Sequence, residues 1–253
     1  MKPELKALAF SVLLVSTPGS AHENDVTWDL RGDMICAESN GVPDHAMGRF
    51  PNRANPNTFR LQRLTFCFPE TPQMAGTVTT GLMTVGVSLT GVPFRPYTAG
   101  YYDPDGRRQL GPDPSSGWRQ QAMHDPRSLG MDAENGHVDR AGLYHYHGVS
   151  PSLEAQAEGG LLGYAPDGFE IRYSPATATS SYVLKAGSRP TPPHGAHDGS
   201  YEEDFEYSAG SGTLDECNGM LVDGTYTYFA TDAYPYLPRC FKGVVNPDFM
   251  TRG

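Results

Sequence analysis

Long apolar runs are almost absent from the sequence. After the first residues, no stretch approaches the roughly 20 consecutive apolar residues of a membrane-spanning helix. At the start, Lys2 and Lys6 precede an apolar stretch that ends near Val15, and small residues follow as far as Ala21. A basic start, a short apolar middle and a small-residue end are typical of a secretory signal peptide. We therefore predict a signal peptide at residues 1–21 and a periplasmic or secreted protein without a membrane span.

Basic residues are also scarce. The chain has 19 Lys and Arg against 29 Asp and Glu, for a formal net charge of −10. Nucleic acids and anionic membranes are bound by basic surfaces, so we do not expect a nucleic-acid partner. The sequence lacks a Gly-x-Ser-x-Gly elbow, a phosphate-binding glycine loop, a His-Glu-x-x-His pair and an EF-hand loop. No catalytic residue can be assigned from such motifs.

Cysteines are few and never closely spaced. There are four, and the absence of a Cys-x-x-Cys pair argues against a four-cysteine zinc site. In an exported protein disulfides are the usual state of cysteine, and four cysteines allow three pairings. The spacing favours the pairs Cys36–Cys67 and Cys217–Cys240, each of which closes a local loop. Each disulfide is expected to stabilise the folded state by about 2–4 kcal/mol.

Glycine and proline, by contrast, are abundant, with 29 and 22 residues, and helical periodicity is scarce. This pattern favours a mainly β fold, sandwich-like or barrel-like, with one or two short helices. We expect one helix at residues 152–158, capped by Ser152, and a surface loop at Arg189–Asp204. Strands are expected on both sides of a turn at residues 165–168 and after the turn at 223–224. With no internal repeat and no linker evident, residues 22–253 are expected to form a single domain.

The histidines carry the clearest chemical signal. His145 and His147 are two positions apart, and on an extended strand such residues point to the same face. His137 precedes them across a turn-like segment at 139–142, so a hairpin would place it beside the pair. Converging neutral imidazoles are common ligands of zinc and copper. We predict a copper or zinc site made by His137, His145 and His147, with His45 as a further ligand.

Other histidines and other interpretations remain open from the residues alone. His124 is a further candidate ligand, and His22 could chelate copper with its free amine if the mature chain begins there. With zinc, an open position would hold a water acidified to a pKa of about 7 for hydrolysis, whereas copper would supply redox chemistry. The alternative is that the histidines are buried and hydrogen-bonded in a structural protein. Tyr144 and Tyr146 face the other side of the strand, where core packing is expected.

The sequence around these histidines resembles the YHYH-domain family, named for the tetrapeptide found here at residues 144–147. The resemblance covers nearly the whole mature chain in one register and implies a single domain. It also implies histidines in the family pattern at His45, His137, His145 and His147, but no particular reaction. The matching segments are Gly41–His45, Phe50–Asn52, Asn55–Asn57, Gly91–Phe94, Asn135–Val138, Gly142–Gly148, Gly163–Phe169, Tyr201–Tyr207, Gly210–Gly219 and Asp232–Gly243.

Two functions of different classes follow. The first is an exported metal-binding protein, which could be a metalloenzyme. The second is a non-enzymatic domain of the cell envelope that binds a glycan, a peptide or another small ligand. An aromatic platform outside the histidine cluster would support the second function. Candidate rings for such a platform are Tyr97, Tyr101, Tyr102 and Trp118.

Overall fold

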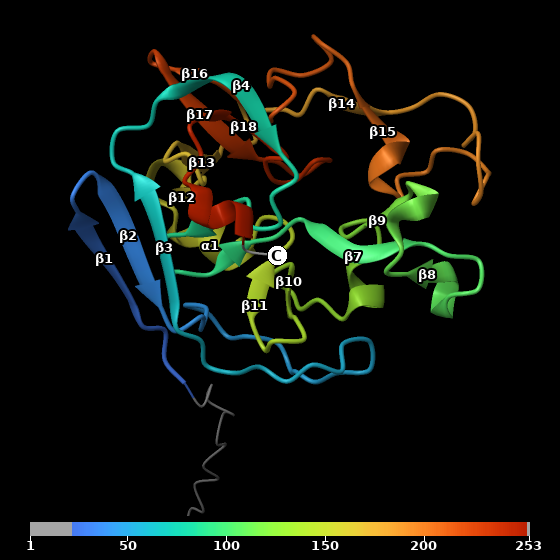
Figure 1. The fold of residues 1–253 in the computed structure, drawn as a ribbon, viewed down its shortest axis with the longest axis horizontal. Helices are drawn as coiled ribbons and strands as arrows, with labels where there is room; N and C mark the ends of the chain where they lie inside the picture. Colours follow the sequence, from blue (N-terminus) through green and yellow to red (C-terminus); the bar gives the residue numbers. More distant parts are fainter. Residues whose placement is uncertain (1–21, 252–253) are drawn as a thin grey trace, which may run out of the picture.

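The computed structural model describes residues 22–251, so the expected signal peptide lies outside the described residues. The fold is mainly β, as expected from the turn-rich sequence, and its short strands form five sheets. Figure 1 shows the β1–β3 sheet on one side of the molecule and the β7–β9 sheet on the other, with β10 and β11 between them; β14 and β15 lie on the same side as the β7–β9 sheet. No sheet formed by residues 22–251 closes on itself, which fits the sandwich-like alternative rather than the barrel.

The largest sheet has eight strands and carries the predicted metal site at one edge. Its strand order is β10-β11-β6-β5-β12-β13-β17-β16. Neighbouring strands are antiparallel except for two parallel pairs, β11 with β6 and β13 with β17. The strands are β5 (Gly86–Ser88), β6 (Pro93–Phe94), β10 (Gly136–Val138), β11 (Tyr144–Tyr146), β12 (Leu161–Tyr164), β13 (Glu170–Tyr173), β16 (Gly219–Val222) and β17 (Thr225–Ala230).

The smaller sheets surround this central sheet. One joins β1 (Val26–Arg31), β2 (Met34–Ser39) and β3 (Leu64–Pro69), and another joins β7 (Tyr97–Tyr102), β8 (Leu110–Gly111) and β9 (Arg119–Gln121). The two-stranded sheets pair β4 (Met74–Thr80) with β18 (Cys240–Gly243), and β14 (Tyr182–Leu184) with β15 (Phe205–Tyr207). Short 3₁₀ helices occur at Arg107–Gln109, Pro114–Ser116, Pro126–Leu129, Glu158–Gly160, Glu202–Asp204 and Pro247–Thr251.

Both expected disulfides are present. Cys36 and Cys67 lie directly opposite each other on β2 and β3 and are bonded. Cys217 is bonded to Cys240, which begins β18. Each bond therefore ties together segments that are close in sequence, as the spacing predicted.

The single α-helix among the described residues is α1 (Pro151–Gln156), close to the predicted range. Its cap differs from the prediction, because the hydroxyl of Ser150, not Ser152, accepts the hydrogen bond of the Leu153 amide. Pro151 explains the shift: its fixed φ suits the first helical position, which makes the residue before it the cap. The Ser152 amide and hydroxyl instead donate to the Glu134 carboxylate.

The central sheet contains a structural repeat, although no internal repeat is evident in the sequence. The order β5-β6-β10-β11 along the chain recurs as β12-β13-β16-β17, and β5 pairs antiparallel with β12 at the centre. The two halves are therefore related by an approximate twofold axis between β5 and β12. Registers agree as well, because Phe94 pairs with Tyr146 in one half as Ile171 pairs with Tyr228 in the other.

The turns of the two halves repeat in the same detail. Between β5 and β6 the Ser88 amide donates to the carbonyl of Val92, and Gly91 adopts φ +80°. Between β12 and β13 the Ala165 amide donates to the carbonyl of Phe169, and a glycine with φ +86° again completes the turn. Few residue types are shared, and the connections differ in length, which is why the repeat is hidden in the sequence.

Candidate metal site

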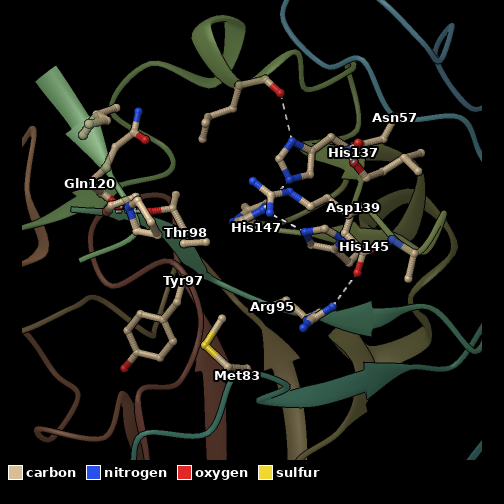
Figure 2. Close-up of a pocket in the computed structure, with 18 of the residues that line it drawn as sticks. Asn57, Met83, Arg95, Tyr97, Thr98, Gln120, His137, Asp139, His145 and His147 are labelled. Carbon is tan, nitrogen blue, oxygen red and sulfur yellow. Dashed lines mark hydrogen bonds and ion pairs between the residues drawn. The ribbon is translucent and has the colours of Figure 1, made fainter. Parts of the chain in front are cut away.

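The hairpin formed by β10 and β11 brings three histidines together. His137 lies opposite His145 in the antiparallel register, and His147, which directly follows β11, faces the same side as His145, as predicted. The Nε2 atom of His147 lies 3.1 Å from that of His145 and 3.1 Å from that of His137 (Figure 2). The ligand atoms of the three residues lie within 4.8 Å of one another, so the cluster could hold a metal ion.

Backbone carbonyls orient each of the three rings through the opposite nitrogen. His137 Nδ1 lies 2.9 Å from the carbonyl oxygen of Leu129. His145 Nδ1 lies 3.2 Å from the carbonyl oxygen of Leu143, and His147 Nδ1 lies 3.2 Å from that of Pro96. A carbonyl accepts hydrogen bonds and cannot donate them, so each Nδ1 carries the proton. Each Nε2 therefore keeps an unprotonated lone pair directed at the centre of the cluster, the tautomer that metal-ligating histidines use.

Three such lone pairs repel one another, and a cation between them would turn this repulsion into attraction. Neutral rings with their protons on Nδ1 have no proton to share across the 3.1 Å Nε2 separations. Zn–N bonds of about 2.0–2.1 Å at tetrahedral angles would place neighbouring nitrogens about 3.3 Å apart. Two of the three separations are thus close to those of a three-histidine zinc or copper site, and the ligand atoms of the third pair lie within 4.8 Å of each other.

The electrostatics of the site keep the rings neutral. Burial lowers the pKa of His145 and His147 well below the usual value for histidine, and the neighbouring histidines lower it further. Burial also lowers the pKa of His137, against the opposing effect of its bond to the Leu129 carbonyl. His145 and His147 are only 5% and 2% exposed. Neutral imidazole is the form that binds a metal, so the site stays competent below neutral pH.

The tyrosines of the tetrapeptide have a structural role. The Tyr144 hydroxyl donates to both oxygens of Asp132, at 3.0 and 2.8 Å, and Asp132 Oδ1 also accepts from the amides of Glu134 and Gly136. These bonds hold the turn that leads into β10. Tyr146, on the same face as Tyr144, is also fully buried, as core packing predicted.

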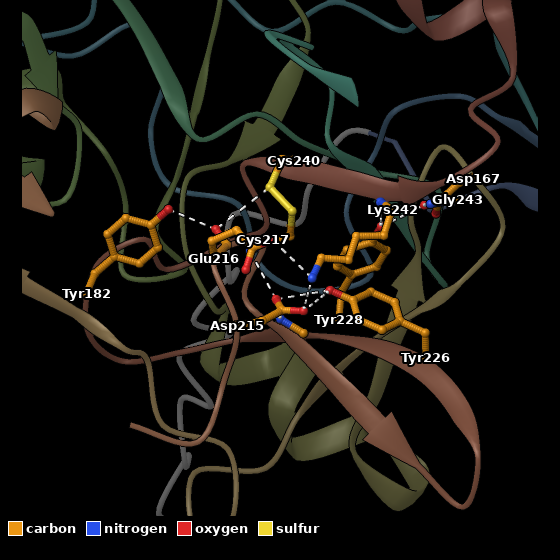
Figure 3. Close-up of a disulfide and its surroundings, with 11 residues drawn as sticks. Asp167, Tyr182, Asp215, Glu216, Cys217, Tyr226, Tyr228, Cys240, Lys242 and Gly243 are labelled. Atoms are coloured by element: carbon orange, nitrogen blue, oxygen red, sulfur yellow. Dashed lines mark hydrogen bonds and ion pairs between the residues drawn. A yellow bond between two sulfur atoms is a disulfide. The ribbon is translucent and has the colours of Figure 1, made fainter. Parts of the chain in front are cut away.

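The second half of the sheet has the same arrangement without histidines. The Tyr226 hydroxyl donates to both oxygens of Asp215, at 3.0 and 2.8 Å, and Asp215 Oδ1 accepts from the amides of Cys217 and Gly219 (Figure 3). Asp132-x-x-Asn-Gly and Tyr144-x-Tyr thus recur as Asp215-x-x-Asn-Gly and Tyr226-x-Tyr. Both asparagines adopt positive φ, 56° at Asn135 and 62° in the second copy.

The positions that correspond to the three histidines are different in the second half. By strand register, Met220 and Thr227 stand where His137 and His145 stand in the first half. Phe229, which follows Tyr228, stands where His147 follows Tyr146. The residues that the two hairpins share therefore form the hairpin structure. The histidines occur only in the first hairpin.

The other predicted histidine ligands lie elsewhere. His45 is on the opposite face of β11, where its Nε2 is 2.7 Å from the Tyr146 hydroxyl, and it does not join the cluster. The alternation of side chains along a strand explains this, because a residue that contacts Tyr146 cannot also face His145. His124 is exposed, and His22 is exposed beside Phe59, with ring centroids 6.5 Å apart.

A cavity of about 700 Å³ opens over the histidine cluster. Arg95 and Asp139 line it, and Arg95 Nη1 contacts Asp139 Oδ2 at 2.9 Å (Figure 2). The sequence pattern indicated only a turn at Asp139 and did not assign a role to Arg95. The sequence offered one indication of a role for Arg95, which is that it directly follows the family-like segment Gly-Val-Pro-Phe at 91–94.

The aromatic rings proposed as a glycan platform are engaged by protein groups. The Arg119 guanidinium lies over the rings of Tyr97 and Tyr101, 4.8 Å from each centroid. Trp118 is only 7% exposed, and its indole nitrogen donates to the Thr191 hydroxyl. Tyr102 packs edge-on against Tyr201, with ring centroids 6.5 Å apart, so all four candidate rings contact other protein groups.

Comparison with known protein families agrees with this description. The model of the YHYH protein family matches residues 65–243, which include all strands of the central sheet and the three clustered histidines. The chain belongs to the YHYH protein family. No curated protein and no solved structure matches this YHYH-family chain. Among the residues described for it, no helix is both long and apolar enough to cross a membrane.

Proposed function

We propose that this YHYH-family protein is an exported metalloprotein that binds copper or zinc through the Nε2 atoms of His137, His145 and His147. The observation that carries the proposal is the convergence of three Nε2 lone pairs while all three Nδ1 atoms are held by carbonyls. Zinc would supply a Lewis acid at this position and copper a one-electron couple, and either suits a metalloenzyme. The two disulfides and the signal-like first residues support export.

The repeat within the central sheet strengthens this proposal. If the histidines served only to complete a buried hydrogen-bond network, the equivalent hairpin would need comparable polar groups. It has Met220, Thr227 and Phe229 instead, and it keeps the same backbone bonds. The histidines are therefore not required to form this hairpin, which favours a role in binding.

The test is metal analysis of protein purified without a polyhistidine tag, followed by titration with zinc and with copper. We expect one ion per chain in the wild type. Replacing His147 with Asn should weaken binding by at least ~100-fold, since even second-shell changes cost about 10–100-fold at metal sites. The control is Thr227→Ala, because Thr227 corresponds in the second hairpin to His145. This variant should bind metal like the wild type.

The same preparation separates the alternatives. A wild-type protein with no bound metal and no micromolar affinity for either ion would overturn the proposal. Equal affinity in His147→Asn and the wild type, with both folded by circular dichroism, would place the metal elsewhere. Mass spectrometry of the mature protein tests the export proposal, which expects a chain that begins at His22.

A further inference from the structure

Arg95 places a cation in the cavity beside the histidine cluster. Its side chain is 14% exposed, and its Nη1 contacts Asp139 Oδ2. Among residues 22–251 its guanidinium makes no other hydrogen bond, so Nε and Nη2 have no protein acceptor. A guanidinium with two unused nitrogens can receive a carboxylate in the two-bond geometry that arginine favours.

The charge balance of the loaded site also favours an anion. Three neutral imidazoles leave the positive charge of a bound copper or zinc ion uncompensated, and no carboxylate belongs to the cluster. Asp139 neutralises Arg95 alone, and its Oδ1 is already occupied by the amides of Ala141 and Leu143. Buried charge without a partner is costly, so a negatively charged ligand would stabilise the loaded cavity.

The remaining walls are largely apolar. Most of the lining side chains are apolar or small, Met83, Leu110 and Leu129 among them, and the cavity volume is about 700 Å³. Asn57, Gln120 and Arg140 add polar groups to the lining, and Arg140 is exposed. Pockets of this size and character hold small organic molecules, with a few polar groups that fix their orientation. The walls therefore suit a ligand with an apolar body as well as a charged end.

We propose that this cavity binds a small organic carboxylate, with its carboxylate on Arg95 and its apolar body against the walls beside the metal site. The proposal rests on the proposed function, because it assigns a ligand class to that same site. It also gives Asp139 a defined effect: its negative charge, held on Nη1, repels a second carboxylate on the same guanidinium and so weakens ligand binding. Removing Asp139 and removing Arg95 should therefore act in opposite directions.

The experiment is calorimetric titration of zinc-loaded protein with benzoate as the probe and benzamide as its uncharged counterpart. We expect benzoate to bind at least ~10-fold more tightly than benzamide, because charge-assisted bonds to arginine are the strong ones. Arg95→Gln should weaken benzoate binding by at least ~10-fold, and Asp139→Asn should strengthen it by ~3-fold or more. Arg172→Gln is the matched control, since Arg172 holds the equivalent position in the second half outside the cavity and should leave binding unchanged.

Zinc content, measured in the same samples, keeps this test separate from that of the metal site. Equal binding of benzoate and benzamide by zinc-loaded protein would overturn the carboxylate proposal and leave the metal site intact. Absence of bound zinc would count against the proposed function instead. If Arg95→Gln does not fold, Arg95→Lys serves in its place, and unchanged benzoate affinity in both Arg95→Lys and Asp139→Asn would overturn the proposal.

Discussion

At the scale of single residues, the tetrapeptide divides into two pairs with different tasks. The tyrosine hydroxyls complete bonds inside the protein, as Tyr144 does with Asp132. The histidines direct their Nε2 atoms at one another instead. Substitutions of the two kinds should therefore affect different properties, stability for the tyrosines and metal binding for the histidines.

Tyr144→Phe should destabilise the protein by about 1–3 kcal/mol, because it removes a donor from the partly buried Asp132 carboxylate. Tyr226→Phe should cost less, since Asp215 Oδ2 keeps the charged Lys242 Nζ at 2.7 Å, whereas Asp132 Oδ2 keeps only the amide of Gly48. Urea denaturation of both variants measures the difference. Metal affinity should stay within a few-fold of the wild type in both variants, and a loss as large as that of His147→Asn would contradict the structural role of Tyr144.

The sequence predicted the three clustered histidines but not their surroundings. Two positions on a strand and one across a turn are local relations, and strand geometry alone fixes which side chains meet. His45 was expected in the cluster because the family pattern contains it, yet the pattern does not say on which face of β11 it lies. Arg95 directly follows β6, whose pairing with β11 joins segments about 50 residues apart in the chain. Such long-range pairing leaves no local pattern.

At the scale of elements, the two equivalent hairpins depend on a glycine that packs under a tyrosine. A side chain at Gly136 would collide with the hydroxyl of Tyr144, and one at Gly219 with that of Tyr226. Each glycine therefore permits the close approach of the tyrosine that bonds the preceding aspartate.

Gly136→Ala and Gly219→Ala should each lower the free energy of unfolding by about 1–3 kcal/mol, the usual cost of overpacking. Gly76→Ala is the control, because Gly76 lies on β4 with open space at its Cβ position, and it should be neutral or slightly stabilising. Denaturant unfolding of the three variants provides the comparison. Equal stability of all three would show that the tyrosine rings can move aside.

The elements were predicted unevenly for a physical reason. The strand Thr225–Ala230 and the hairpin around residues 165–168 follow from turn residues and alternation, and the structure confirms both. The segment Arg189–Asp204 was expected to be a simple surface loop. Instead the Arg189 guanidinium is buried and bonds the fully buried Asp204 carboxylate through Nε at 2.8 Å and Nη2 at 2.6 Å. Charges in a polar segment look exposed in sequence, because nothing local reveals that they pair.

At the scale of the whole molecule, the buried histidines should make the metal-free protein sensitive to acid. Their pKa values are lowered in the folded state, mainly by burial, so below about pH 6.5 the unfolded chain binds protons that the native state rejects. The free energy of unfolding therefore keeps its full value above about pH 6.5. It declines as the pH falls below that value, by up to about 1.4 kcal/mol per pH unit for each histidine.

Urea unfolding in EDTA at pH 7 and pH 5 measures this decline. The variant His145→Gln/His147→Gln should show a much shallower loss between the two values. Zinc at 100 times its dissociation constant should raise stability at pH 7 by about 2.7 kcal/mol in the wild type and far less in the double variant. An equally steep acid loss in the variant would mean that other groups cause it.

The pairing of His137 with His145 across the hairpin bears on how relatives should be interpreted. The third imidazole comes from outside the four letters that name the family, whereas two of those letters belong to the scaffold. A relative that retains the tetrapeptide but lacks a histidine at the position of His137 would keep the hairpin and offer only two metal-ligating nitrogens. Transferring a metal-dependent role between homologues therefore requires inspecting that distant position first.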